Sequence, residues 1–141
     1  MELLTRVYDY VSGTFLKVFR ILTFGWSDGN TFLLLRHCLL RRGVMTGQVM
    51  VVLVTAQPVL PGAKNFVKAL LTEAEKQSVT ITTIVQNVND RKTSVVLGDM
   101  EKVLYGKGFI LDELCGKTYA LSPRSFYQIN HTQTEVLYGL A

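Results

Sequence analysis

Residues 48–55 read QVMVVLVT, and every position from Val49 to Val54 carries an apolar side chain. Successive side chains of a strand point to opposite faces of its sheet, so a strand that is apolar throughout must be covered on both faces. The stretch therefore predicts a central strand. We expect it to lie between strands at residues 32–40 and 79–88, which are also rich in apolar and β-branched side chains.

The segment between the second and third of these strands predicts a helix over residues 63–77. Its apolar side chains recur at helical spacing and form one stripe: Phe66, Val67, Leu70, Leu71 and Ala74. We expect this stripe to pack on one face of the sheet. The predicted fold class is α+β, with a small mixed or antiparallel sheet and one or two packed helices.

Shorter signals follow along the chain. Residues 89–92 predict a hairpin-type turn that leads into a return strand at 93–97. Arg91 and Lys92 at this turn could contact phosphate, or could simply be solvated. Short strands are expected near residues 103–105, 109–111 and 118–121. Asn130, with Gln133 three residues later, predicts the N-cap of a final helix.

Composition narrows the class of protein. The 141 residues are 48% apolar and 18% charged, which suffices for a buried core and excludes a disordered chain. A net charge of +4 permits a nucleic-acid partner without requiring one. We interpret Cys38 and Cys115 as reduced thiols of a cytoplasmic protein, and we expect no metal site. Charges interrupt the apolar stretches, so we expect neither a membrane span nor a signal peptide.

The chemistry of the chain is concentrated between residues 121 and 140. The aromatic pair Phe126-Tyr127 directly precedes the amide of Gln128. An aromatic face can stack on a nucleobase, and a carboxamide offers both a donor and an acceptor, as a uracil edge requires. The same residues are also consistent with a strand that ends in a capped helix, with Phe126 in the core. The residues alone leave both interpretations open.

The run SPRSFYQINxxQTExLY at residues 122–138 closely resembles a motif of the RNA uracil-C5 methyltransferases, which use S-adenosylmethionine to make 5-methyluridine. Further runs match the family in the same order over residues 32–141. They are TGQVMVVLV (46–54), IVQNVN (84–89), TSVVLG (93–98), LYGK (104–107) and LCGK (114–117). The bacterial branch that modifies 23S ribosomal RNA gives the best match.

This resemblance implies a domain organisation. Residues 32–125 would form the central α+β domain of such an enzyme, and residues 126–141 would begin the link to a Rossmann-like catalytic domain that the chain lacks. Residues 1–31 match the family poorly, with an insertion at 15–31. The helix at 130–141 would expose an apolar stripe, so self-association is expected. The stripe comprises Val136, Leu137 and Leu140.

The resemblance also implies roles for two residues. Gln128 would contribute to both the cofactor site and the target-uracil site, and Phe126 would lie beside the flipped base. The family's nucleophilic cysteine, general base and cofactor loop would follow Ala141, so we expect no catalytic residue here, and neither Cys38 nor Cys115 takes that role. The chain alone should not methylate RNA. The alternative is a non-catalytic RNA-binding or structural domain.

Overall fold

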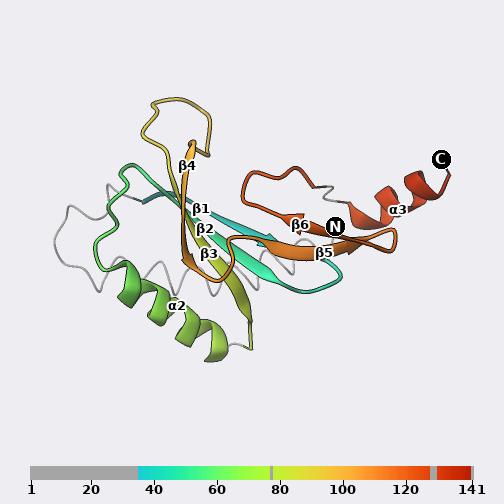
Figure 1. The fold of residues 1–141 in the computed structure, drawn as a ribbon, viewed down its shortest axis with the longest axis horizontal. Helices are drawn as coiled ribbons and strands as arrows, with labels where there is room; N and C mark the ends of the chain where they lie inside the picture. The colour runs from blue at the N-terminus through green and yellow to red at the C-terminus, as the bar shows by residue number, and fades with distance from the viewer. Residues whose placement is uncertain (1–34, 77, 128–129, 141) are drawn as a thin grey trace.

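The computed structural model describes residues 35–76, 78–127 and 130–140 (Figure 1). The predictions for residues 1–31, and the position of Gln128, lie outside the described residues. The elements in chain order are β1 (Leu35–Arg42), β2 (Val49–Thr55), α2 (Ala63–Lys76), β3 (Ile81–Val88), β4 (Met100–Tyr105), β5 (Ile110–Leu114), β6 (Lys117–Leu121) and α3 (His131–Gly139).

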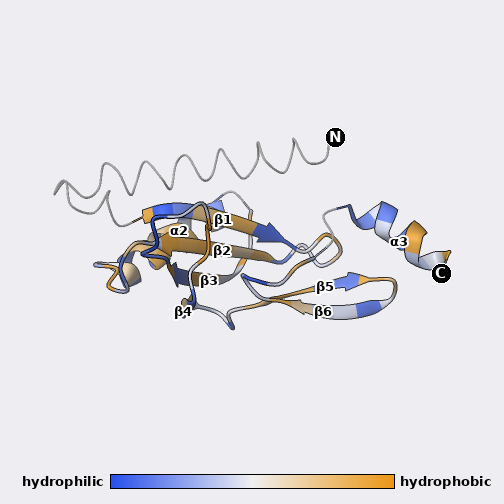
Figure 2. Ribbon diagram, turned by 90° about the horizontal axis from the view of Figure 1, so that it is seen from above, coloured by the Kyte–Doolittle hydropathy of each residue, from blue (hydrophilic) through white to orange (hydrophobic). Residues whose placement is uncertain are grey.

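β2 is an interior strand of a four-stranded sheet with the order β1-β2-β3-β4. All seven of its residues are buried, as the unbroken apolar stretch predicts, and Figure 2 shows it as apolar along its length. β1 and β4 run antiparallel to their neighbours, whereas β2 and β3 are parallel. The sheet is therefore mixed, and the α+β prediction is confirmed.

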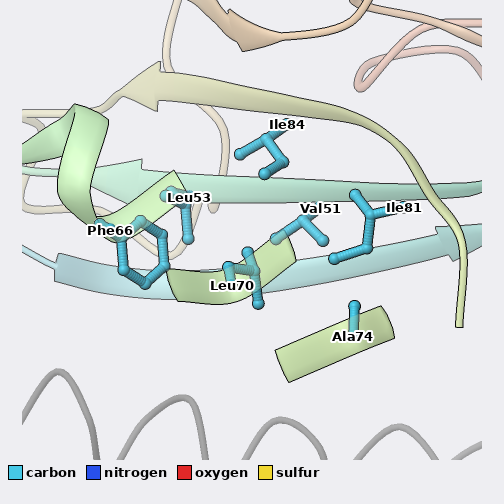
Figure 3. Close-up of a cluster of buried hydrophobic side chains, with 7 residues drawn as sticks. All are labelled: Val51, Leu53, Phe66, Leu70, Ala74, Ile81 and Ile84. Atoms are coloured by element: carbon cyan, nitrogen blue, oxygen red, sulfur yellow. The ribbon is translucent and has the colours of Figure 1, made fainter. Parts of the chain in front are cut away.

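α2 connects the two parallel strands, which need a crossover because a tight turn can join only antiparallel neighbours. Its buried side chains Phe66, Leu70 and Ala74 pack against one face of the sheet (Figure 3). The sheet residues beneath them come from β2 and β3: Val51, Leu53, Ile81 and Ile84. The predicted helix and its packing are confirmed.

A second core covers the opposite face of β2. Met50, Val52 and Val54 pack there against Ile110 of β5 and Leu121 of β6. β5 and β6 form a separate antiparallel hairpin. Its turn places Cys115 and Gly116 at φ values of 52° and 71°, the left-handed conformation of a two-residue hairpin loop. In Figure 1 the hairpin extends to one side of the sheet, with α3 near its far end.

The predicted return strand at residues 93–97 is wrong. These residues form a loop, and the strand that pairs with β3 is β4. The β-branched run misled the prediction because Val96 and Leu97 pack into the second core, outside any strand ladder. Gly98 then passes close to the end of β3, where an added Cβ would lie 1.8 Å from the Val88 carbonyl oxygen. The later short strands exist, with shifted bounds.

Candidate functional site

The segment that follows β6 carries the predicted site residues, and a local turn shapes its beginning. The Ser125 backbone N–H donates to the Ser122 carbonyl at 3.2 Å. In return, the Ser122 N–H donates to Ser125 Oγ at 3.0 Å, and the two hydroxyl oxygens lie 2.8 Å apart. The two serines thus close a compact turn around Pro123 and Arg124, as Ser side chains commonly do beside prolines.

Arg41 of β1 ties this turn to the sheet. Its Nη1 donates to the Ser122 carbonyl at 2.5 Å and to the Pro123 carbonyl at 3.3 Å, across more than 80 positions of sequence. The residue is half-buried, and burial lowers the pKa of its guanidinium. A desolvated cation bonded to backbone carbonyls makes strong hydrogen bonds, so Arg41 fixes the start of the site segment.

The aromatic pair divides between solvent and core. Phe126 is 85% exposed, whereas Tyr127 is half-buried and packs against the second core. The Tyr127 ring also lies 6.4 Å from the ring of Tyr119 on β6. The interpretation that placed Phe126 in the core is therefore wrong: Tyr127 is the anchor, and it leaves the face of Phe126 open.

Asp112 joins three parts of the chain beneath this segment. Its buried carboxylate accepts backbone N–H groups of the β1–β2 turn, at 2.9 Å from Val44, 2.9 Å from Met45 and 3.3 Å from Thr46. Burial by itself would raise the pKa of Asp112, but these donors and the neighbouring Tyr127 hydroxyl outweigh it and hold the pKa below its usual value. The bonds fix the turn to β5.

The Tyr127 hydroxyl faces the same carboxylate. It is buried and does not reach the geometry of a regular hydrogen bond. Burial, followed by the interaction with Asp112, raises the pKa of Tyr127 to about 12. The phenol therefore stays protonated at neutral pH and contributes no charge to the site.

Exposed arginines lie beside the site segment. Arg91, from the β3–β4 loop, and Arg124, from the serine turn, both pair with the carboxylate of Asp99, Arg124 at 3.2 Å. Arg36 of β1 supports the same loop, because its Nη1 donates to the carbonyl oxygens of Asn89 at 2.7 Å and Arg91 at 2.6 Å. Arg91, in the turn that was predicted to be solvated or phosphate-binding, thus shares the Asp99 carboxylate with Arg124.

The two cysteines lie in different environments. Burial raises the pKa of Cys38 to about 12, so its reactive thiolate is scarce at neutral pH. Cys115 is exposed at the tip of the β5–β6 hairpin. No group of three or more His, Cys, Asp or Glu residues that could hold a metal ion occurs among the described residues. No helix within the described ranges is long and apolar enough to cross a membrane.

Three buried amides on β3 and just after it shape the neighbouring loops, and the sequence analysis missed them. Gln86 Nε2 donates to Thr55 Oγ1 at 2.9 Å and to the Pro58 carbonyl at 3.2 Å. Asn87 exchanges two hydrogen bonds with the backbone of Gly98. Asn89 Nδ2 donates to the carbonyls of Val95 and Val96. Amides inside an otherwise apolar strand were the available signal, because buried amides need partners.

The fold is a small α+β domain whose site segment exposes the ring of Phe126 two residues after Arg124, and Arg124 shares the carboxylate of Asp99 with Arg91. The chain matches no family model. An uncharacterized RNA methyltransferase of Listeria monocytogenes is 45% identical over 107 residues, which are 76% of this chain and 22% of that protein. An uncharacterized RNA methyltransferase of Oceanobacillus iheyensis is 43% identical over the same shares.

A solved structure agrees with these relatives. The tRNA (uracil-54, C5)-methyltransferase of Pyrococcus abyssi, in complex with S-adenosyl-L-homocysteine, superposes with a TM-score of 0.60 at 33% identity. The match covers 76% of this chain and 24% of that one. The chain is therefore similar to a part of these RNA methyltransferases, and it spans about a fifth of the length of the curated relatives, 22%.

Proposed function

We propose that this chain is the part of an S-adenosylmethionine-dependent RNA methyltransferase that holds the target base. The enzyme would convert uridine to 5-methyluridine. The observation that carries the proposal is the open face of Phe126 on a segment anchored by Arg41 and Tyr127. The uracil-C5 chemistry of the Pyrococcus abyssi protein supports the choice of base. By sequence resemblance, the RNA is 23S ribosomal RNA and the compartment is the cytoplasm.

Phe126 and Gln128 are proposed to hold the target base together. A flipped uracil presents an acceptor, O4, beside a donor, N3–H, and a carboxamide can satisfy both with two hydrogen bonds. The Phe126 ring would cover the face of the base. Base–aromatic stacking contributes about 1–3 kcal/mol, which corresponds to roughly a fivefold to 150-fold effect on affinity. Tyr127, which faces the core, has no direct contact with the base in this account.

S-adenosylmethionine would supply the methyl group when bound. Gln128 is the one proposed cofactor contact in this chain. Asp112 and Asp99, the carboxylates that adjoin the site segment, already accept backbone N–H groups and arginine N–H groups respectively. Asp112 is buried and held by these bonds, and Asp99 is paired with two arginines. These two carboxylates therefore form no prepared site for the ribose of the cofactor.

We propose further that the chain alone does not transfer methyl groups. The reaction needs a nucleophile that adds to uracil C6, and a thiol with a raised pKa, such as Cys38, is poorly suited to that step. The alternative function, a non-catalytic RNA-binding domain, predicts the same inactivity. The difference between the two lies in a full-length context, where the first should support 5-methyluridine formation.

A chimaera tests the proposal. The matching 107-residue segment of the Listeria monocytogenes relative is replaced by that of this chain. The purified protein is then incubated with ribosomal RNA and radiolabelled S-adenosylmethionine, and the labelled nucleosides are separated. Label in 5-methyluridine supports the proposal, whereas label confined to another nucleoside would contradict it. The isolated chain, assayed beside it, should give no product.

A further inference from the structure

Arg91 and Arg124 come from different loops and meet on one carboxylate, that of Asp99. The side chains are 51%, 50% and 63% exposed respectively, so water reaches all three. Exposed ion pairs of this kind contribute about 0–1 kcal/mol to stability. The arrangement is therefore weakly held, and another anion could take over the arginine donors at little cost.

The backbones that carry the two arginines are fixed, in contrast to their side-chain ends. The Arg91 N–H donates to Asn89 Oδ1 at 3.0 Å, and Arg36 donates to the Arg91 carbonyl. Arg124 lies within the serine turn that Arg41 anchors. Two guanidinium groups are thus delivered to one place by rigid supports, which lowers the entropy cost of binding a ligand there.

The position of this pair relative to Phe126 indicates the ligand. Phe126 follows Arg124 by two residues and exposes its ring. Both residues belong to the segment over the second core, which covers the face of the sheet opposite α2. Single-stranded RNA binding combines cations that track the phosphates with aromatic rings that stack on the bases. On the β3–β4 loop, the exposed neighbours of Arg91 are Asp90 and Lys92, which carry opposite charges.

We propose that Arg91 and Arg124 form a binding site for the phosphates of the RNA strand that flanks the base on Phe126, and that Asp99 stands in for a phosphate when RNA is absent. The inference rests on the proposed function, because it takes RNA as the substrate. Guanidinium groups bind phosphate oxygens through paired N–H donors, the same donors that Asp99 occupies here.

The test measures binding of a labelled oligouridylate of about 12 nucleotides to the full chain by fluorescence anisotropy, over a range of salt concentrations. Arg91→Gln and Arg124→Gln should each weaken binding and reduce the salt slope by about 0.7. The control is Lys64→Gln with Lys68→Gln, two exposed cations on α2 at the opposite face, which should change neither quantity. An equal loss in the control would overturn the proposal.

Asp99→Asn separates a phosphate site from a purely structural ion pair. If phosphate takes the donors that Asp99 holds, removal of the competing carboxylate should raise the affinity at low salt by roughly twofold or more. A fall in affinity at an unchanged melting temperature would show that Asp99 is needed for binding, and would contradict the proposal.

A second probe separates the phosphate site from base recognition. An abasic strand of equal length should lose affinity with the arginine variants but not with Phe126→Ala, whereas oligouridylate should lose affinity with both. The proposed function is tested separately, by methyl transfer in the chimaera. If the arginine variants bind RNA as tightly as the wild-type chain while the chimaera forms 5-methyluridine, this phosphate site alone is rejected. If the arginine variants weaken RNA binding as expected but the chimaera forms no 5-methyluridine, the methylation proposal alone is rejected.

Discussion

The guanidinium of Arg41 donates to the carbonyl oxygen of Ser122 at 2.5 Å and so joins β1 to the segment that presents Phe126. This contact links the sheet to the candidate site, together with the packing of Tyr127 on the second core. It is a hydrogen bond from a half-buried cation to a backbone acceptor. Removal of Arg41 would leave the Ser122 carbonyl with the Ser125 N–H alone and would take the arginine donor from the Pro123 carbonyl.

Arg41→Met, which keeps the aliphatic stem without the charge, should therefore lower the free energy of unfolding by about 1.5–3 kcal/mol. Urea denaturation at neutral pH measures the change. The matched control is Arg42→Met at the next, exposed position, for which we expect a change within about 0.5 kcal/mol. Equal effects of the two variants would show that the Arg41 contact does not stabilise the fold.

Asp112 should make the free energy of unfolding depend on pH in the acid range. Its pKa in the folded chain lies below the unfolded value of about 3.9. Its contribution to the free energy of unfolding is therefore complete above that value, and is lost as the pH falls through the lower folded pKa. Asp112→Asn should cost about 1–3 kcal/mol at pH 7, because the amide leaves backbone donors unpaired.

The gap between the wild-type chain and Asp112→Asn should narrow as the pH falls below the unfolded value of about 3.9 toward the lower folded pKa of Asp112. Denaturation curves at pH 7 and pH 3 measure both values. Asp90→Asn, on an exposed loop position, serves as the control and should leave the pH dependence unchanged. A gap that stays constant between the two pH values would rule out a stabilising role for the ionised Asp112.

The aromatic pair should respond asymmetrically to truncation. Phe126→Ala removes a ring that is 85% exposed and should change the free energy of unfolding by less than about 0.5 kcal/mol. Tyr127→Ala removes a ring packed on the second core and should cost about 2 kcal/mol or more. Thermal melts of the two variants, recorded side by side, check the order, and similar losses would contradict the placement of the two rings.

The sequence predicted several elements of the fold, but it did not predict which of these two rings faces the core. The strand β2 and the helix α2 were predictable because burial on both faces, or on one stripe, leaves a pattern in neighbouring residues. The N-cap at Asn130 was predictable from a local motif, an Asn followed three residues later by a Gln, and its Oδ1 accepts the Gln133 N–H at 3.1 Å. Consecutive residues of an extended segment face opposite ways, but local sequence does not say which faces the core.

Contacts between distant positions were not predictable. Asp112 and Met45 lie 67 residues apart, and neither local sequence predicts the hydrogen bond between them. The loop at residues 93–97 looked like a strand because valines and a leucine favour strands. Its backbone carbonyls instead accept from Asn89, and two of its side chains fill the second core. Tertiary contacts override local propensity at such places.

The apolar side of α3 should drive self-association of the isolated chain. Val136, Leu137 and Leu140 are 55%, 63% and 82% exposed, and a second copy would cover them. Static light scattering should show a species larger than a monomer at high concentration. Leu137→Glu with Leu140→Glu should restore the monomer, whereas Val59→Glu, at an exposed position before α2, should not. A wild-type chain that stays monomeric would contradict this prediction.

The most direct test of the account is the rate of 5-methyluridine formation by the chimaera carrying Gln128→Leu, measured with the melting temperature of the same preparation. A residue that pairs with the uracil edge contributes about 1–3 kcal/mol, so the rate should fall roughly tenfold or more. The melting temperature should not change, and Gln128→Glu, which cannot donate to O4, should also fail. A lower melting temperature with an unchanged rate per folded molecule would contradict the account.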